Sequence, residues 1–185
     1  MPAHTARRTF TVDEYHKMAA SDIFQGERVE LVEGEVLTMA PMGSRHAACI
    51  ARLTQKLTEM RAPGSQIRVQ LPVQLSPFTE LEPDIAVVRA RDDFYSSSHP
   101  GREDLLLVIE VAESSLTYDR DIKFPVYARS GVPEAWLVDL AADRIELHSG
   151  PTADGNGTVE LKGPGDVIAS RHHPWLALNA ELLLG

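Results

Sequence analysis

The sequence predicts a mixed α/β (α+β) fold, in which helices flank a central mixed β-sheet. Two continuous apolar runs, Leu105–Ser115 and Glu134–Leu140, have the composition of strands that are buried on both faces. An amphipathic helix is predicted ahead of them, because Ile50, Leu53 and Leu57 recur at helical spacing. Together with their neighbours, these segments follow the order helix, strand, strand, strand, helix, strand, which is typical of a mixed sheet covered by helices.

Length and composition are ordinary for one globular domain. The 185 residues are 43% apolar and 24% charged, without a charge block or a low-complexity tract. We expect a single domain over residues 1–185, with a core at about residues 44–140 and extra β-hairpins near both ends. No apolar stretch approaches the roughly 20 residues that span a bilayer, and no signal peptide is recognisable. We therefore expect no membrane attachment and a cytoplasmic location.

The net charge of −9 argues against a protein that coats nucleic acid nonspecifically, because basic contacts to phosphate supply most of the affinity of such proteins. It does not exclude a nuclease, since acidic residues that hold divalent cations contribute negative charge at the site itself. The lone cysteine, Cys49, excludes an internal disulfide and a cysteine-based zinc site. Its place in the helical pattern indicates a core position.

Local signals predict the N-terminal elements. Thr11 and Glu14 have the spacing of a capping box, which indicates a short helix near Val12–Ala20. Two β-rich runs on either side of Gly34 indicate a hairpin whose turn uses the glycine at positive φ. Ser44 is the candidate N-cap of the amphipathic helix.

The segments after the amphipathic helix are predicted as two strands and a loop. Pro63-Gly64 ends the helix, and the alternating run Gln66–Leu75 predicts a strand with one more polar face. A shorter apolar strand, Glu82–Val88, follows. Residues 89–103 are polar, with Ser, Pro and Gly, and are expected to form a mobile loop.

Pro125 constrains the helix that follows the Leu105–Ser115 strand. A proline inside a helix loses a hydrogen bond and clashes with the preceding turn, so we expect the helix to begin late. With Asp121 or a neighbour as its N-cap, Lys123 would lie in the first turn.

The remaining segments are expected at the margins of the sheet. The run at residues 144–150 is a partner for the Glu134–Leu140 strand, and the tail should form a glycine-turned hairpin and a short terminal helix. We expect residues 10–40 and 141–185 to add strands to the edges of the main sheet.

The residues with the clearest chemical meaning are two carboxylates on neighbouring strands. Glu110 lies at the centre of a buried strand, where an unpaired ionised group is costly, so it requires a partner, a metal ion or a function. Asp84 opens the preceding strand, and adjacent strands lie about 4.8 Å apart, so both carboxylates can converge on one ion. Such ligands suit Mg²⁺ or Mn²⁺ better than Zn²⁺. Lys123 could orient or deprotonate an attacking water, or stabilise charge on a phosphate.

Each of these residues also has a structural interpretation. Asp84 could be a strand-edge residue that follows proline. Glu110 could form a buried ion pair with Arg120, Arg129 or Lys123. Lys123 itself could be a solvated lysine of the first helical turn.

The same residues resemble a known superfamily. Pro83-Asp84, Glu110 within "VIEVAESS" and Lys123 within "DRDIKFPVYARSG" resemble the PD-(D/E)XK nucleases, whose core has the same order of elements. A closer resemblance is to the Uma-two family of restriction-endonuclease-like proteins. It rests on "VELVEGEVLTMAP" with a histidine after it, on "EPDIAVV", and on the long block Glu110–Asp139. The likeness covers about residues 10–180, and the long block is its most specific part.

The resemblance implies a restriction-endonuclease-like core and a metal-dependent phosphodiesterase centre that acts on DNA. Asp84 and Glu110 would be ligands of Mg²⁺ or Mn²⁺, and Lys123 would be the catalytic lysine. Glu30 would be an accessory acidic residue, although strand alternation gives it a solvent-facing alternative. His46 matches a family position close to the site. By analogy with related nucleases, a homodimer would supply the two centres that cutting both strands requires.

One position departs from the simplest superfamily pattern, in which the lysine lies two residues after the acid. That position here is Ala112, and the resemblance offers Lys123 as a displaced substitute. The leading hypothesis is a DNA endonuclease in which a metal-activated water attacks the phosphodiester. Ala112 and the acidic charge favour the alternative of a nucleic-acid-binding or interaction module without efficient catalysis. A hydrolase of some other phosphate ester is a third hypothesis, because the ligands recognise an ion and not a base.

Overall fold

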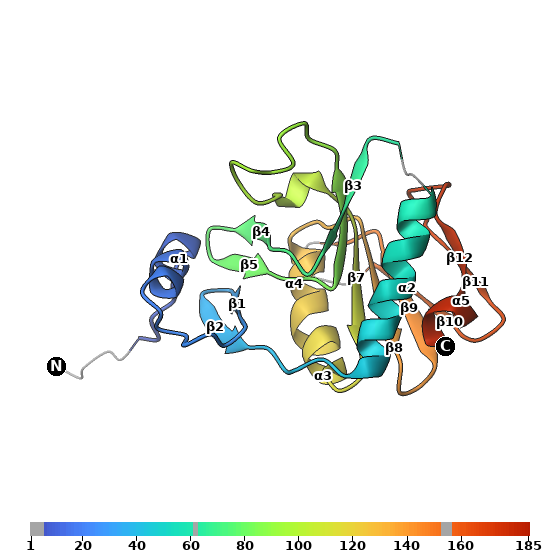
Figure 1. Cartoon of the computed structure of the whole chain (residues 1–185), viewed down its shortest axis with the longest axis horizontal. Coiled ribbons are helices and arrows are strands. Elements are labelled where there is room, and N and C mark those ends of the chain that lie inside the picture. Colours follow the sequence, from blue (N-terminus) through green and yellow to red (C-terminus); the bar gives the residue numbers. More distant parts are fainter. Residues whose placement is uncertain (1–5, 61–62, 153–156) are drawn as a thin grey trace.

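The computed structural model describes residues 6–60, 63–152 and 157–185, and its centre is a six-stranded mixed sheet (Figure 1). Only β7 and β8 run parallel to each other among the neighbouring strands of this sheet. The predicted mixed sheet flanked by helices is confirmed. In spatial order its strands are β10 (Thr158–Lys162), β9 (Arg144–Ser149), β8 (Glu134–Asp139), β7 (Leu105–Ala112), β6 (Ile85–Arg89) and β3 (Ser65–Val69).

Two hydrophobic clusters cover the two faces of this sheet. On one face lies α2 (Ser44–Met60), which buries Cys49, Ile50, Leu53 and Leu57 as its periodicity predicts. On the other face lies α4 (Phe124–Arg129), which contributes Phe124, Val126 and Tyr127 to the second cluster. Figure 1 shows these helices on opposite sides of β7. In the central strands β6, β7 and β8, alternate residues therefore belong to different clusters.

A second, four-stranded sheet corrects the prediction for residues 10–40. The predicted hairpin forms, with positive φ at Glu33 and Gly34, but it does not join the main sheet. The hairpin pairs with a strand that follows α2 in the sequence. The helix α1 (Val12–Ala20) precedes the hairpin and begins at the predicted capping box. In spatial order the strands are β2 (Glu35–Thr38), β1 (Val29–Val32), β5 (Thr79–Leu81) and β4 (Val73–Ser76).

The predicted single strand over Gln66–Leu75 is wrong, because the chain breaks after β3. Gln70 has a left-handed backbone with φ of 50°, and Pro72 has no N–H to donate to a ladder. The residues on either side therefore belong to different sheets, with β3 in the larger and β4 in the smaller. This break also places Gln70 beside Asp84, to whose carbonyl oxygen its N–H donates at 3.1 Å.

The helical segment after β7 begins earlier than predicted. It runs through α3 (Leu116–Tyr118), a π-helical turn η2 (Asp119–Lys123) and then α4, so a start at Asp121 is wrong. Pro125 is tolerated because it lies in the first turn of α4, directly after the wider π turn. Lys123 consequently lies at the junction of the two helical forms, with its side chain buried.

The C-terminal segment matches the prediction only in part. β9 and β10 extend the main sheet as expected, although the turn between them includes residues 153–156, which lie outside the described residues. Beyond them, β11 (Val167–Ala169) and β12 (Ala177–Asn179) form a separate two-stranded sheet, followed by α5 (Ala180–Leu184). The predicted loop at 89–103 ends in the 3₁₀ turn η1 (Arg102–Asp104). Within the described residues, no helix combines the length and apolar character needed to cross a bilayer.

Candidate active site

The register of β6 against β7 brings the two predicted carboxylates together. Ile85 pairs with Ile109, so Asp84 at the start of β6 lies beside Glu110. The backbone N–H of Asp84 donates to Glu110 Oε2 at 3.2 Å. Glu110 is only 2% exposed, as expected for the centre of an apolar strand. The two acids therefore do not point to opposite faces of the sheet.

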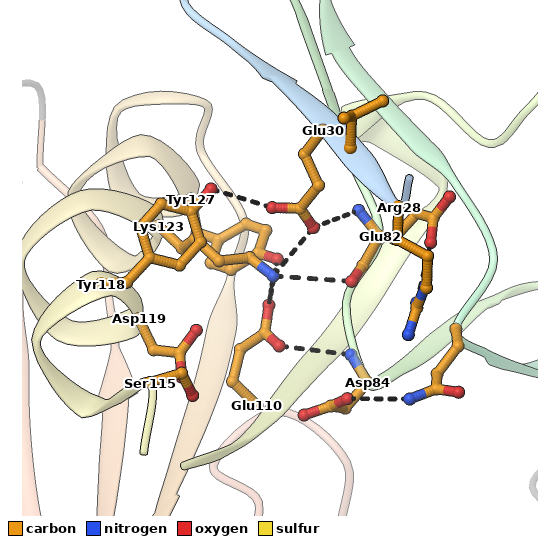
Figure 2. Close-up of polar contacts among 12 residues, drawn as sticks. Arg28, Glu30, Glu82, Asp84, Glu110, Ser115, Tyr118, Asp119, Lys123 and Tyr127 are labelled. Carbon is orange, nitrogen blue, oxygen red and sulfur yellow. Dashed lines mark hydrogen bonds and ion pairs between the residues drawn. The ribbon is translucent and has the colours of Figure 1, made fainter. Parts of the chain in front are cut away.

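Lys123 reaches Glu110 from the helical segment (Figure 2). Its Nζ lies 2.7 Å from Glu110 Oε1 and 3.1 Å from Glu30 Oε1, and it donates to the Glu82 carbonyl oxygen at 3.5 Å. Lys123 is 2% exposed, so a solvated first-turn lysine is the wrong description. The predicted ion pair with Glu110 is present, and it lies beside Asp84 at the same end of the sheet.

Glu30 is buried, which rules out its solvent-facing alternative. Its Oε1 accepts from the Glu82 N–H at 2.8 Å, and its Oε2 accepts from the Tyr118 hydroxyl at 2.9 Å. Together with Lys123, these donors satisfy the carboxylate on both oxygens. By contrast, Glu33 is exposed and pairs with Arg129 at 2.7 Å.

Two tyrosine hydroxyls belong to this network, although no sequence pattern indicates their role directly. The Tyr127 ring is a core aromatic, but its hydroxyl donates to Glu110 Oε1 at 2.5 Å. Tyr118, Lys123 and Tyr127 all point at the same two carboxylates from one side of the helical segment. Their spacing of five and then four residues is the available sequence signal, and the π turn explains the longer interval.

His46 lies in the first turn of α2 and binds Asp84. Its Nε2 is 2.8 Å from Asp84 Oδ2, which also accepts from the Val111 N–H at 2.9 Å. Burial opposes ionisation of Asp84, but the His46 contact, the Val111 N–H and Lys123 together lower its pKa. Burial likewise opposes charge on His46, and the hydrogen bond and charge of Asp84 outweigh it and raise the pKa of the imidazole.

Glu110 and Lys123 titrate as a coupled pair. Burial raises the pKa of Glu110 to about 8, against the opposing attraction of Lys123 and with the help of Asp84. Burial also disfavours charge on Lys123, but the carboxylates of Glu110 and Glu30 raise its pKa well above the usual lysine range. Lys123 is therefore a cation throughout the physiological pH range.

The cluster opens into a pocket of about 260 Å³. Glu30 is not one of its lining residues, whereas His46, Asp84, Glu110 and Lys123 are. The pocket is acidic, because its wall carries more carboxylates than basic groups. The lining carboxylates are Glu82, Asp84, Glu110, Glu113 and Asp119, and the basic side chains are Arg28, His46 and Lys123.

Asp119 and Ala112 are two further buried residues near the pocket. Asp119 accepts from the Ser115 hydroxyl at 2.5 Å and thereby joins the loop after β7 to the helical segment. Ala112 is buried in the cluster beneath α4. A lysine is therefore missing from the strand, but the Nζ of Lys123 lies within ion-pair distance of Glu110.

The donor set fits a hard divalent cation. Asp84 Oδ1 accepts only a long bond of 3.3 Å from Gln70, and Glu110 Oε2 accepts one backbone N–H, so both oxygens retain lone pairs. Mg²⁺ commonly takes one or two carboxylates and completes its shell with water and phosphate oxygens. Among the described residues no third His, Cys, Asp or Glu donor completes a tight cluster here.

Comparisons with known proteins agree with this architecture. Residues 12–181 match the Uma2 family, which is described as "Putative restriction endonuclease". A solved structure from Anabaena variabilis ATCC 29413, titled as "a putative nuclease belonging to DUF820", superposes with a TM-score of 0.70. The alignment covers 95% of this chain and 97% of that one at 16% identity, so the likeness is one of fold. No curated protein matches significantly. Because the family match extends over nearly the whole sequence, the chain belongs to the Uma2 family of restriction-endonuclease-like proteins.

Proposed function

We propose that the chain is a metal-dependent endonuclease that hydrolyses phosphodiester bonds in DNA. The observation that carries this proposal is the convergence of Asp84, Glu110 and Lys123 in one pocket. Two carboxylates with free lone pairs and one buried ammonium group are the components that cation-assisted phosphodiester hydrolysis requires. The family to which the chain belongs supports the same class of reaction.

The acidity of the pocket supports the dependence on metal. A phosphodiester would meet several carboxylates there, and their repulsion is much larger than in bulk water because the site is partly buried. Asp84 and Glu110 would hold Mg²⁺ or Mn²⁺. The bound ion would neutralise the phosphate and lower the pKa of a water molecule.

The protein's own groups have separate roles in this proposal. Lys123 stays protonated, so it acts by stabilising negative charge on the phosphate and does not accept the proton of water. Glu30, Tyr118 and Tyr127 position this lysine and its carboxylate partner. His46 holds Asp84 in its ionised form. We expect each role to be separable by substitution.

A cleavage assay on supercoiled and linear DNA tests the proposal. The protein is incubated with EDTA, Mg²⁺ or Mn²⁺ over a range of pH, because burial raises the pKa of Glu110 and a bound cation would favour its ionised form. We expect metal-dependent cleavage by the wild type, and none above background by Asp84→Asn or Lys123→Ala. The matched control is Asp121→Asn, an exposed acid on η2, which should cleave like the wild type. Direct conversion of plasmid to linear product would indicate that two centres act together, as in a homodimer.

One observation favours a second candidate function. The cation nearest to Glu110 is Lys123, which already neutralises part of its charge and thus weakens its attraction for a metal ion. A nucleic-acid-binding or interaction module without efficient catalysis is consistent with that arrangement. Absence of metal-dependent cleavage, together with DNA binding that survives Asp84→Asn, would establish this alternative and contradict the nuclease.

A further inference from the structure

A second cluster of metal-binding side chains lies outside the pocket. His16 comes from α1, Glu80 from β5, and His99 from the loop ahead of η1. Each offers one ligand atom, and these atoms all lie within 4.8 Å of one another. None of the three residues lines the candidate active-site pocket. The cluster therefore needs an explanation separate from phosphodiester hydrolysis.

Two of its polar atoms are buried without a partner. Glu80 is 5% exposed, and only its Oε1 has a contact, with His16 Nε2 at 2.8 Å. Its Oε2 is buried and has no hydrogen-bond partner, and the same holds for Nδ1 of His99. Only four such atoms occur in the part of the chain that the structure describes, and two of them belong to residues of this cluster. Unsatisfied buried polar atoms are costly, so their coincidence at one place indicates that something binds them.

We propose that His16, Glu80 and His99 form a binding site for a divalent transition-metal ion, with Zn²⁺ as the natural occupant. Two imidazoles and one carboxylate are a typical zinc ligand set, whereas Mg²⁺ and Ca²⁺ prefer oxygen ligands alone. This preference for a transition metal differs from that expected for Asp84 and Glu110, whose oxygen ligands suit Mg²⁺ or Mn²⁺. Three protein ligands leave the fourth tetrahedral position to water, on the side where His16 is exposed.

The geometry requires only small movements. Ligand atoms that surround one tetrahedral zinc at about 2.0–2.2 Å lie roughly 3.3–3.6 Å from each other. The contact between His16 and Glu80 would open from 2.8 Å, and the longer separations, which are at most 4.8 Å, would shorten. His16 is an exposed residue of a short helix, so its side chain can adjust while Glu80 remains fixed in its sheet.

The consequence of binding would be structural. α1 otherwise contacts the small sheet through a few bonds, such as Tyr15 Oη to the Val29 carbonyl oxygen at 2.9 Å. A metal ion at this place would join α1, β5 and the loop of His99, which are far apart in sequence. Such a cross-link stabilises the folded state by mass action, since the unfolded chain does not present the three ligands together.

Titration of the EDTA-treated full chain with Co²⁺ tests the site. Cobalt substitutes for zinc and gives visible d–d absorption in a tetrahedral site. We expect a saturable tetrahedral absorption in the wild type, its loss when zinc displaces the cobalt, and no such signal in His16→Ala and His99→Ala. His172→Ala is the matched control, an exposed histidine elsewhere on the surface, and should bind like the wild type. Asp84→Asn should also retain the signal, which separates this site from the active-site pocket.

Thermal unfolding provides the second readout. Zinc at about 100-fold above its Kd should raise the Tm of the wild type by an amount on the order of 5 °C and leave His16→Ala unchanged. His16 is exposed, so this variant should fold even if His99→Ala does not. The proposal is overturned if the wild type shows no saturable absorption, if His16→Ala retains it, or if Asp84→Asn alone abolishes it. None of these outcomes depends on nuclease activity.

Discussion

Glu110 and Glu134 lie on neighbouring parallel strands and are almost equally buried, at 2% and 1% exposed, yet their surroundings differ. Glu134 accepts from Trp136 Nε1 at 2.7 Å and from the Ser170 hydroxyl at 2.6 Å, so both of its oxygens meet neutral donors. Glu110 instead meets the ammonium group of Lys123 and lines a pocket that it shares with a second carboxylate.

This difference shows what burial of an acid does and does not indicate. A buried carboxylate in a strand requires hydrogen-bond donors, and both residues have them. Only the pocket, the second acid and the cationic partner distinguish a candidate active site from a structural hydrogen-bond anchor. The same substitution at both positions tests whether the two carboxylates have different roles.

The largest expected effect is on cleavage by Glu110→Gln. If Glu110 holds the metal, the neutral amide should lower the initial rate of plasmid nicking by roughly 10³-fold, which corresponds to several kcal/mol of transition-state stabilisation. Glu134→Gln should leave the rate within about twofold, because Glu134 does not line the pocket. Equal losses in both variants would show that cleavage depends on the integrity of the sheet and not on the site.

Lys123→Met should have the largest effect on stability. It leaves Glu110 and Glu30 buried without their cation, and removal of one partner of a buried ion pair costs about 3–5 kcal/mol. Urea unfolding monitored by circular dichroism measures the loss. The double variant with Glu110→Gln should recover part of it, since it removes one of the uncompensated charges. Strictly additive losses would contradict coupling between the two residues.

Glu134→Gln should be destabilised to a smaller extent. The amide nitrogen of glutamine cannot accept a hydrogen bond, so either Trp136 or Ser170 loses its acceptor. We expect a loss of about 1–3 kcal/mol, which lowers the Tm of a chain of this size by roughly 3–10 °C. Differential scanning calorimetry measures the change. Ser170→Ala should be destabilised as well, because its hydroxyl donates to Glu134 and accepts from the backbone N–H groups of His172 and His173.

Elements with short-range signals could be predicted from the sequence. The capping box at Thr11, the turn at Gly34 and the buried face of α2 each depend on residues within a few positions, and all three are present. The left-handed backbone at Gln70 carries no such signal, because glycine or asparagine is usual there. No local sequence pattern indicates the π turn before Pro125 either, so the predicted start of the helix is too late.

The candidate site was predictable where neighbouring strands supply it. Strand adjacency alone predicts that Asp84 and Glu110 converge, and the following helix supplies Lys123. The family resemblance adds Glu30 and His46. The hydroxyl of Tyr127 could not be distinguished from an ordinary core aromatic, because its role depends on where its tip points. The cluster around Glu80 could not be predicted at all, since its three ligands come together only in the folded chain.

The smallest expected effects concern two histidines. His46 lies in the pocket beside Asp84, and His148 pairs with Ala135, the residue after Glu134 on β8. The pKa of His148 is lowered by burial and by Arg120, despite the hydrogen bond that its Nε2 donates to Glu146, whereas the pKa of His46 is raised. The stability that His46 contributes should be fully present below the ordinary histidine pKa of about 6.5 and be lost as pH rises through its folded value. That of His148 should be present above about 6.5 and be lost as pH falls. Urea unfolding of His46→Gln and His148→Gln in EDTA, from acidic to alkaline pH, should therefore give deficits relative to the wild type that change in opposite directions with pH. If the stability deficits of the two variants changed with pH in the same direction, the two imidazoles would have similar environments. The contrast between the pocket and the surroundings of Glu134 would then not extend to these histidines.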